Sequence, residues 1–123
     1  MISNLIWSGA ALTERLNRLL PGNQFEFVMT SSDYFMRKPN RLLFDIALRK
    51  AGVPADEVWY CGDNPQADID GASQAGIYPV WYDNDTVMDK PDKYRSDEYL
   101  PQCEHLHIRE WSEMMDLLER MKP

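Results

Sequence analysis

The chain has 123 residues, of which 44% are apolar, so it has enough apolar material for one domain with a hydrophobic core or for a piece of a larger one. Its 20 acidic and 13 basic residues give a net charge of −7, which argues against nucleic-acid and anionic-membrane binding, because both need clustered Lys and Arg. No apolar run is long enough to cross a membrane, and the first residues lack the pattern of a signal peptide. Cys61 lies in an apolar run where we expect a buried thiol, and a soluble cytoplasmic protein is predicted.

The first quarter of the chain predicts a strand, a helix and a second strand. A strand is expected to end at Ile2, and Ser8 is a suitable N-cap for the helix that follows. The apolar positions of that helix recur at helical spacing: Leu12, Leu16 and Leu19. The sequence Pro21-Gly22-Asn23 ends the helix, and Phe25–Met29 is predicted to be a short strand.

A polar loop over Thr30–Lys38 precedes a second helix. Asn40 is its predicted N-cap, and Gly52 is expected to end it. One apolar stripe runs along it: Leu43, Phe44, Ala47, Leu48 and Ala51. Val58–Cys61 is then a continuous apolar run, which is typical of a strand covered on both faces.

The rest of the chain predicts a third helix, two more strands and a last helix. The acidic loop Asp63–Asp70 leads into a helix that ends at Gly76, and Tyr78–Tyr82 follows as a strand. Residues 83–98 carry many acids and are predicted to form a solvated connection, with room for a short helical turn. His105–Ile108 is predicted as a strand. The helix over Glu110–Met121 has an apolar stripe that we expect to be core: Trp111, Met114, Met115, Leu118 and Met121.

This alternation of strands and helices predicts an α/β protein with a parallel sheet in a three-layer, Rossmann-like α/β/α arrangement. We expect one domain over residues 1–123. Its residues 1–82 carry the motifs, 83–104 form the acidic connection, and 105–123 hold the terminal strand and helix.

Two carboxylates follow the third predicted strand. Asp63 comes directly after the strand and Gly62, and Asp68 stands near the start of the next helix. Ligands of open parallel sheets bind at the carboxyl ends of strands, and paired carboxylates suit Mg²⁺, which screens phosphate charge in phosphoryl transfer. The alternative is that Asp63 favours a turn and Asp68 favours a helix start.

Polar residues also precede the second helix and follow the first strand. Lys38 before the helix can reach a bound phosphate, although a lysine in a surface loop is the simpler interpretation. Ser3 and Asn4 at the end of the first strand can donate hydrogen bonds to phosphate oxygens.

Taken in this order, the hydroxyl at a strand end, the lysine before a helix and the Gly-Asp-x₄-Asp loop resemble the haloacid dehalogenase-like (HAD) hydrolase superfamily. The resemblance covers Met1 to Tyr82 and is closest from Lys38-Pro39 to Gly71-Ala72 and at Ala75-Gly76. It implies that Ser3, with Asn4 beside it, binds the transferred phosphoryl group. It also implies that Lys38 neutralises nucleophile and phosphate as a catalytic and phosphate-binding residue, and that Asp63 and Asp68 hold Mg²⁺.

The family's first motif, Asp-x-Asp at the end of a central strand, is expected well before Ser3. The only such strings here are Asp68-Ile69-Asp70 and Asp83-Asn84-Asp85, and neither fits the family order. We therefore expect a truncated chain that lacks the central first strand, the nucleophile and the cap. We expect it to be inactive alone, and exposed strand edges would favour a homo-oligomer.

The resemblance implies that the complete enzyme is a Mg²⁺-dependent phosphohydrolase, which cleaves a small phosphorylated metabolite through an aspartyl-phosphate. Two alternatives stay open. One is a non-catalytic binding or assembly module that keeps the fold, and the other is a fragment of a metal-independent haloacid dehalogenase.

Overall fold

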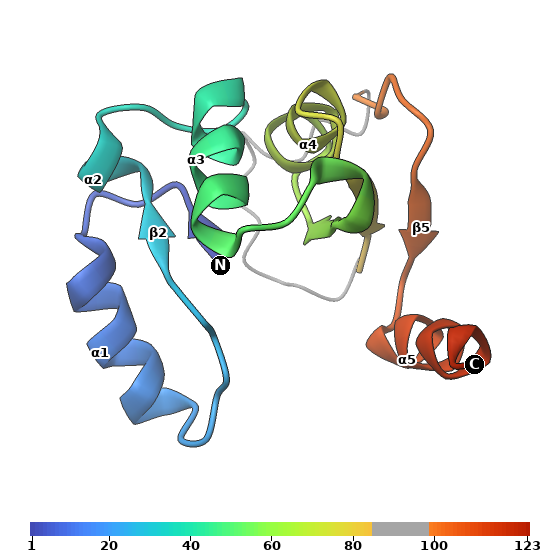
Figure 1. Ribbon diagram of the computed structural model, residues 1–123, viewed down its shortest axis with the longest axis horizontal. Coiled ribbons are helices and arrows are strands. Elements are labelled where there is room, and N and C mark those ends of the chain that lie inside the picture. Colours follow the sequence, from blue (N-terminus) through green and yellow to red (C-terminus); the bar gives the residue numbers. More distant parts are fainter. Residues whose placement is uncertain (85–98) are drawn as a thin grey trace. The chain divides into compact units, whose positions relative to one another are not determined.

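The computed structural model describes residues 1–84 and 99–123 and divides the chain into two compact units, Met1–Gly52 and Val53–Pro123 (Figure 1). The first unit has a two-stranded sheet and the second has a three-stranded sheet. Every strand pair in the described residues is parallel. The predicted α/β class with parallel strands and intervening helices is therefore confirmed.

In the first unit, β1 (Ile2–Ser3) pairs with β2 (Met29–Thr30), with Ile2 opposite Met29. The strand predicted over Phe25–Met29 is wrong in its extent. The short β1 offers a ladder partner only for Met29 and Thr30, while the Phe25 side chain is 47% exposed. Both β2 residues are fully buried and form part of the core of this unit.

Helix α1 (Gly9–Leu19) begins as predicted, because the Ser8 Oγ accepts a hydrogen bond from the Ala11 backbone N–H at 3.2 Å. A second acceptor comes from far along the chain, since the Asp33 carboxylate accepts from the Gly9 N–H at 2.7 Å. Asp33 belongs to α2 (Ser31–Tyr34), a short helix inside the segment that we predicted to be a polar loop. The serine hydroxyls of that segment donate to backbone carbonyls about 25 residues earlier, between β1 and α1, and so hold this turn against that loop.

Helix α3 (Arg41–Ala51) agrees with the prediction at both ends. The Asn40 side chain accepts from the Leu42 N–H at 3.0 Å, and Gly52 takes the left-handed conformation with φ of +70°. Its residues Leu43 and Phe44 are completely buried. The Asn40 cap places the start of α3 two residues after Pro39 and three after Lys38.

In the second unit, β4 (Tyr78–Tyr82) lies between β3 (Trp59–Gly62) and β5 (Leu106–Ile108). A short 3₁₀ turn, η1 (Ala55–Glu57), precedes β3. The π-helical segment η2 (Pro65–Asp70) and α4 (Gly71–Gln74) connect β3 to β4. The best-buried apolar side chains of the unit are Ile69, Ala72 and Val80, followed by Ile108 on β5 and Ile77 just before β4.

The prediction that Cys61 is a buried thiol is wrong, because the residue is exposed. It lies on β3, and the elements of this unit leave its side chain uncovered. An apolar run predicts a strand correctly here, but it does not predict how many neighbours that strand has.

Helix α5 (Trp111–Met121) begins with a capping box in which Glu110 and Glu113 accept each other's backbone N–H bonds. The prediction that its apolar stripe is core is wrong. Within its own unit the Trp111 ring stacks on Tyr82 at 4.6 Å, while Met115, Leu118 and Met121 are exposed. The stripe follows the helical period, but only its first turn meets the end of the sheet (Figure 1).

The predicted helical turn in the acidic connection lies in residues 85–98, outside the described part of the chain. Among residues 1–84 and 99–123, no helix has the length and apolar character that a membrane crossing needs. The single-domain boundaries that we expected stay a prediction.

Candidate functional site

In the first unit, the structure brings Asn4 and Lys38 together through a reciprocal pair of hydrogen bonds. The Asn4 side-chain Nδ2 donates to the Lys38 carbonyl at 3.1 Å, and the Lys38 backbone N–H donates to the Asn4 Oδ1 at 2.9 Å. The Asn4 amide thus pairs with the N–H and C=O of Lys38 in the way that the backbone of a neighbouring strand would. This pair fixes the loop before α3 against the carboxyl end of β1.

The Lys38 side chain also lies at this strand end, because its Nζ donates to the Ile2 carbonyl at 3.3 Å. Ser3 stands between Ile2 and Asn4, so the three residues predicted to bind phosphate come from one small region of the first unit. Ser3 pairs across the sheet with Thr30, whose Oγ1 lies 3.1 Å from the Ser32 Oγ. The Ser32 hydroxyl in turn donates to the Trp7 carbonyl at 2.6 Å, so this hydroxyl has a structural partner.

In the second unit, Asp63 follows β3 and opens the turn into η2. Asn64 is the N-cap of η2, since its Oδ1 accepts from the Ala67 N–H at 2.7 Å and from the Gln66 N–H at 3.1 Å. Pro65 at the first helical position suits this start, because its ring presets the helical φ. The sequence around the turn therefore fixes where η2 begins and so where Asp68 lies.

Asp68 is only 4% exposed, and its two oxygens have separate partners. Oδ2 accepts from the Asn64 N–H at 3.0 Å, and Oδ1 accepts from the Tyr60 hydroxyl at 3.4 Å. Its side chain also packs against Gly62, where a Cβ would lie 2.4 Å from the Asp68 Cγ. Asp68 thus fixes the turn that carries Asp63, and the closeness of the two elements requires glycine at position 62.

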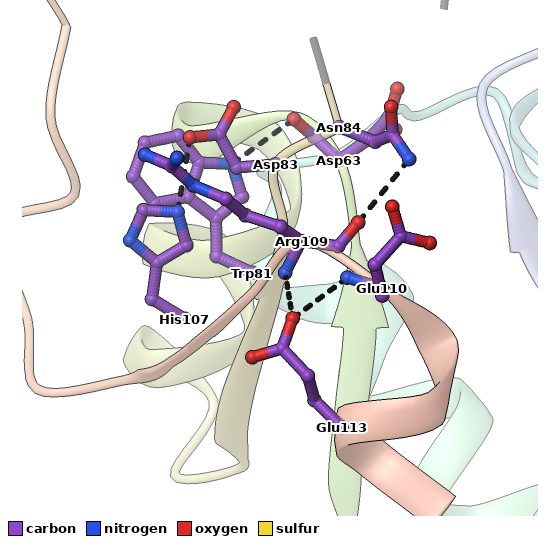
Figure 2. Close-up of polar contacts among 8 residues, drawn as sticks. All are labelled: Asp63, Trp81, Asp83, Asn84, His107, Arg109, Glu110 and Glu113. Atoms are coloured by element: carbon purple, nitrogen blue, oxygen red, sulfur yellow. Dashed lines mark hydrogen bonds and ion pairs between the residues drawn. The ribbon is translucent and has the colours of Figure 1, made fainter. Parts of the chain in front are cut away.

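Asp63 itself is exposed, and its backbone carbonyl accepts from the Trp81 indole Nε1 at 3.4 Å (Figure 2). Within residues 1–84 and 99–123, no three or more His, Cys, Asp and Glu side chains gather as a metal site. Mg²⁺ does not need such a cage, because proteins bind it through one or two carboxylates, with water and substrate phosphate completing the shell. An exposed carboxylate at Asp63 with Asp68 beside the same turn fits that chemistry.

Sequence reasoning missed three residues that organise these two regions: Asp33, Tyr60 and Asn64. Asn64 had a local signal, since an Asn before a Pro at a strand end is a common helix start. Asp33 and Tyr60 had none. Asp33 meets the Gly9 N–H across 24 residues of chain, and Tyr60 meets Asp68 only once η2 has folded back onto the end of β3.

The partly buried Tyr60 leads to a prediction about alkaline pH. Burial first, and then the Asp68 charge, raise the pKa of Tyr60 well above its ordinary value. The folded state therefore keeps a proton that the unfolded chain loses above about pH 10, so stability falls as the pH rises, by up to about 1.4 kcal/mol per unit. Urea unfolding at pH 8 to 11 measures this slope.

In the Tyr60→Phe variant the same titration is expected to show a shallower slope. Tyr78→Phe is a suitable control, since Tyr78 is exposed on the neighbouring strand. Equal slopes for the parent chain and Tyr60→Phe would contradict the assignment of the buried phenol.

Known proteins resemble this chain in sequence and in fold. Residues 35–105 match the family model described as HAD-hydrolase-like. A phosphoserine phosphatase of Thermus thermophilus is 37% identical over 70 residues, which are 57% of this chain and 28% of that protein. A glyceraldehyde 3-phosphate phosphatase of Methanopyrus kandleri is 31% identical over 118 residues, which are 94% of this chain and 48% of that protein.

A solved structure, the 2-haloacid dehalogenase of Pseudomonas syringae pv. Tomato DC3000, aligns with a TM-score of 0.63 at 28% identity, over 87% of this chain and 43% of that one. The chain thus spans about half or less of the length of these three proteins. The matched family model covers more than half of the chain, including Lys38, Asp63 and Asp68. The chain therefore belongs to the haloacid dehalogenase-like hydrolase family.

Proposed function

We propose that this chain contributes the phosphate-binding and metal-binding residues of a Mg²⁺-dependent phosphohydrolase that acts on a small phosphate monoester. The single observation that carries the proposal is the reciprocal bonding of Asn4 and Lys38, which fixes a lysine at the carboxyl end of β1. The similarity to curated phosphatases supports the same class of reaction.

In the first unit, Lys38 serves as the positive charge for the phosphoryl group. Its ammonium lies close to the end of β1, where the Ser3 hydroxyl is available as a donor. Asn4 acts mainly through Lys38, because its oxygen and one N–H already bond to the Lys38 backbone. The remaining N–H of the Asn4 amide is a second donor for a phosphate oxygen.

In the second unit, Asp63 is the residue that binds Mg²⁺ directly, and Asp68 fixes the turn and completes the acidic environment. When bound there, the cation supplies positive charge that offsets the charge of the transferred phosphate. The Asp68 oxygens accept from Asn64 and Tyr60, so this carboxylate is already oriented before any ligand arrives. Such preorganisation lowers the entropy lost on binding.

The complete enzyme is proposed to work through an aspartyl-phosphate, and by family order we expect neither Asp-x-Asp string of this chain to supply its nucleophile. Asp68 and Asp70 are buried and hydrogen-bonded, and Asp83 bonds to His107. We therefore expect no turnover of p-nitrophenyl phosphate with Mg²⁺ by these 123 residues alone. Measurable turnover that is lost in Asp63→Asn would contradict this expectation.

Metal binding is the direct test of the site. Titration of Mg²⁺ into the ¹⁵N-labelled chain is expected to shift backbone amide signals around Asp63, and Asp63→Asn should weaken binding at least about tenfold, a loss of about 1.4 kcal/mol. Asp56→Asn removes an equally exposed acid from η1 of the same unit and should leave the affinity unchanged. The same affinity in both variants would rule out Asp63 as the ligand.

A haloacid dehalogenase is the second candidate, and the aligned dehalogenase structure favours it. The family resemblance implies that the dehalogenase reaction works without Mg²⁺. The two candidates therefore predict different responses in the Mg²⁺ titration. A chain with the fold intact and no Mg²⁺ response at millimolar concentration would support the dehalogenase over the phosphatase.

A further inference from the structure

Two stacked side chains, Trp81 of β4 and His107 of β5, lie beside the Asp63 turn. Trp81 lies near the carboxyl end of the central strand, opposite Gly62 on β3 and opposite His107 on β5. It is only 9% exposed although it is the second-last residue of its strand. Its position on the central strand lets one side chain contact both neighbouring strand ends.

Trp81 contacts the proposed metal ligand through a hydrogen bond. Its indole Nε1 donates to the Asp63 backbone carbonyl at 3.4 Å, as the dashed line in Figure 2 marks. The carbonyl belongs to the peptide group that follows the Asp63 Cα. Fixing this group limits the backbone rotation of Asp63 and so the direction of its Cα–Cβ bond.

The indole is in turn held by its other neighbours. The His107 ring stacks on Trp81 with centroids 4.5 Å apart and planes 21° apart, and His105 meets the same ring edge-on at 5.7 Å. The His107 Nε2 lies 3.0 Å from the Asp83 Oδ2, so a carboxylate after β4 orients the imidazole (Figure 2). The contacts therefore run from Asp83 through His107 and Trp81 to Asp63.

We propose that Trp81 is a positioning residue for Asp63 and that Asp83 and His107 set the plane of its ring. The proposal rests on the metal-binding role of Asp63 given above. An exposed carboxylate in a turn loses backbone and side-chain freedom when it binds a cation, and a partner that fixes its backbone beforehand reduces that loss. Trp81 supplies such a partner from outside the turn, whereas Asp68 and Asn64 supply it from within.

The test separates the hydrogen bond from the packing. Trp81→Phe keeps an aromatic ring against His107 and removes the N–H donor, and we expect Mg²⁺ binding to weaken about tenfold. Trp59→Phe is the matched control, because Trp59 lies at the other end of β3 and its ring contacts Tyr78. Both variants lose the same atoms, so a general loss of core packing would lower both affinities together.

A spectroscopic readout comes from the unaltered chain. The four tryptophans give separate indole N–H signals in a ¹⁵N-labelled sample, and Trp81→Phe identifies the one from Trp81. We expect this signal to move on addition of Mg²⁺, to be broadened by Mn²⁺, and to lie at a different frequency in His107→Leu before any metal is added.

The outcomes distinguish this proposal from the one on which it rests. No Asp63-dependent response to Mg²⁺ anywhere in the spectrum overturns the metal site and the positioning role with it. If the response depends on Asp63 but Trp81→Phe and Trp59→Phe bind Mg²⁺ equally well, the metal site stands and the positioning role is overturned. The same holds if the Trp81 indole signal does not move when Mg²⁺ is added.

Discussion

Replacement of Gly62 by alanine is expected to lower the free energy of unfolding by about 3 kcal/mol or more, because the added methyl group overlaps a neighbour that cannot move away. The new Cβ would lie 2.4 Å from the Asp68 Cβ and Cγ and 2.6 Å from its Oδ2. A rotamer change of Asp68 does not relieve the contact with its Cβ. Either β3 or η2 has to shift, and Asp63 lies between them.

Urea unfolding followed by circular dichroism measures this loss. Gly22→Ala is the control, since Gly22 has a φ of +87° but nothing within 4 Å of the added Cβ. It carries only the backbone strain of a left-handed alanine, about 1 kcal/mol. Equal losses for the two variants would show that strain explains the result and that Gly62 and Asp68 are not closely packed.

Replacement of Asp70 by alanine is the second large effect, and we expect a loss of about 2–3 kcal/mol. The Asp70 carboxylate is 7% exposed and accepts bonds from the chain segment that leads into β5. The Tyr99 hydroxyl donates to Oδ2, the Gln102 N–H donates to Oδ1 at 2.8 Å, and the Cys103 Sγ lies 3.5 Å from Oδ1. Alanine leaves the Gln102 N–H without this acceptor.

Asp70→Asn is the graded comparison, because its amide oxygen still accepts one of these bonds and the loss should be about half as large. Asp56→Ala in η1 serves as the surface control and is expected to change stability by less than about 0.5 kcal/mol. Thermal unfolding of the three variants gives the order of their stability losses. A loss for Asp70→Ala no greater than that for Asp56→Ala would contradict a structural role of the buried carboxylate.

Features that depend on neighbouring residues could be predicted from the sequence. Ser8 and Asn40 cap α1 and α3 as expected, and Gly52 ends α3 with a positive φ, because each needs only the residues two or three positions away. The parallel class followed from the alternation of strands and helices. The region around Lys38 and Asn4 was identified from motif order.

Features that depend on distant residues could not be predicted. Asp33 accepts from the first N–H of α1 across two dozen residues, and Asp70 orients the segment before β5. The exposure of Cys61 depends on what packs on its face of the sheet, and the exposure of Met115 depends on what α5 packs against. Hydrophobic periodicity identifies the apolar face of a helix or strand, but it does not identify what packs against that face.

The parallel pairing of the described strands also bears on how the protein reaches this structure. The strand pairs join Ile2 to Met29, Trp59 to Tyr78 and Val80 to Leu106. A long loop must therefore close before the first hydrogen bond of each ladder can form. No described ladder starts from a hairpin, which is the cheapest nucleus for a sheet. Refolding should therefore be governed by loop closure, in the range of milliseconds to seconds, with the capped helices forming ahead of the strands.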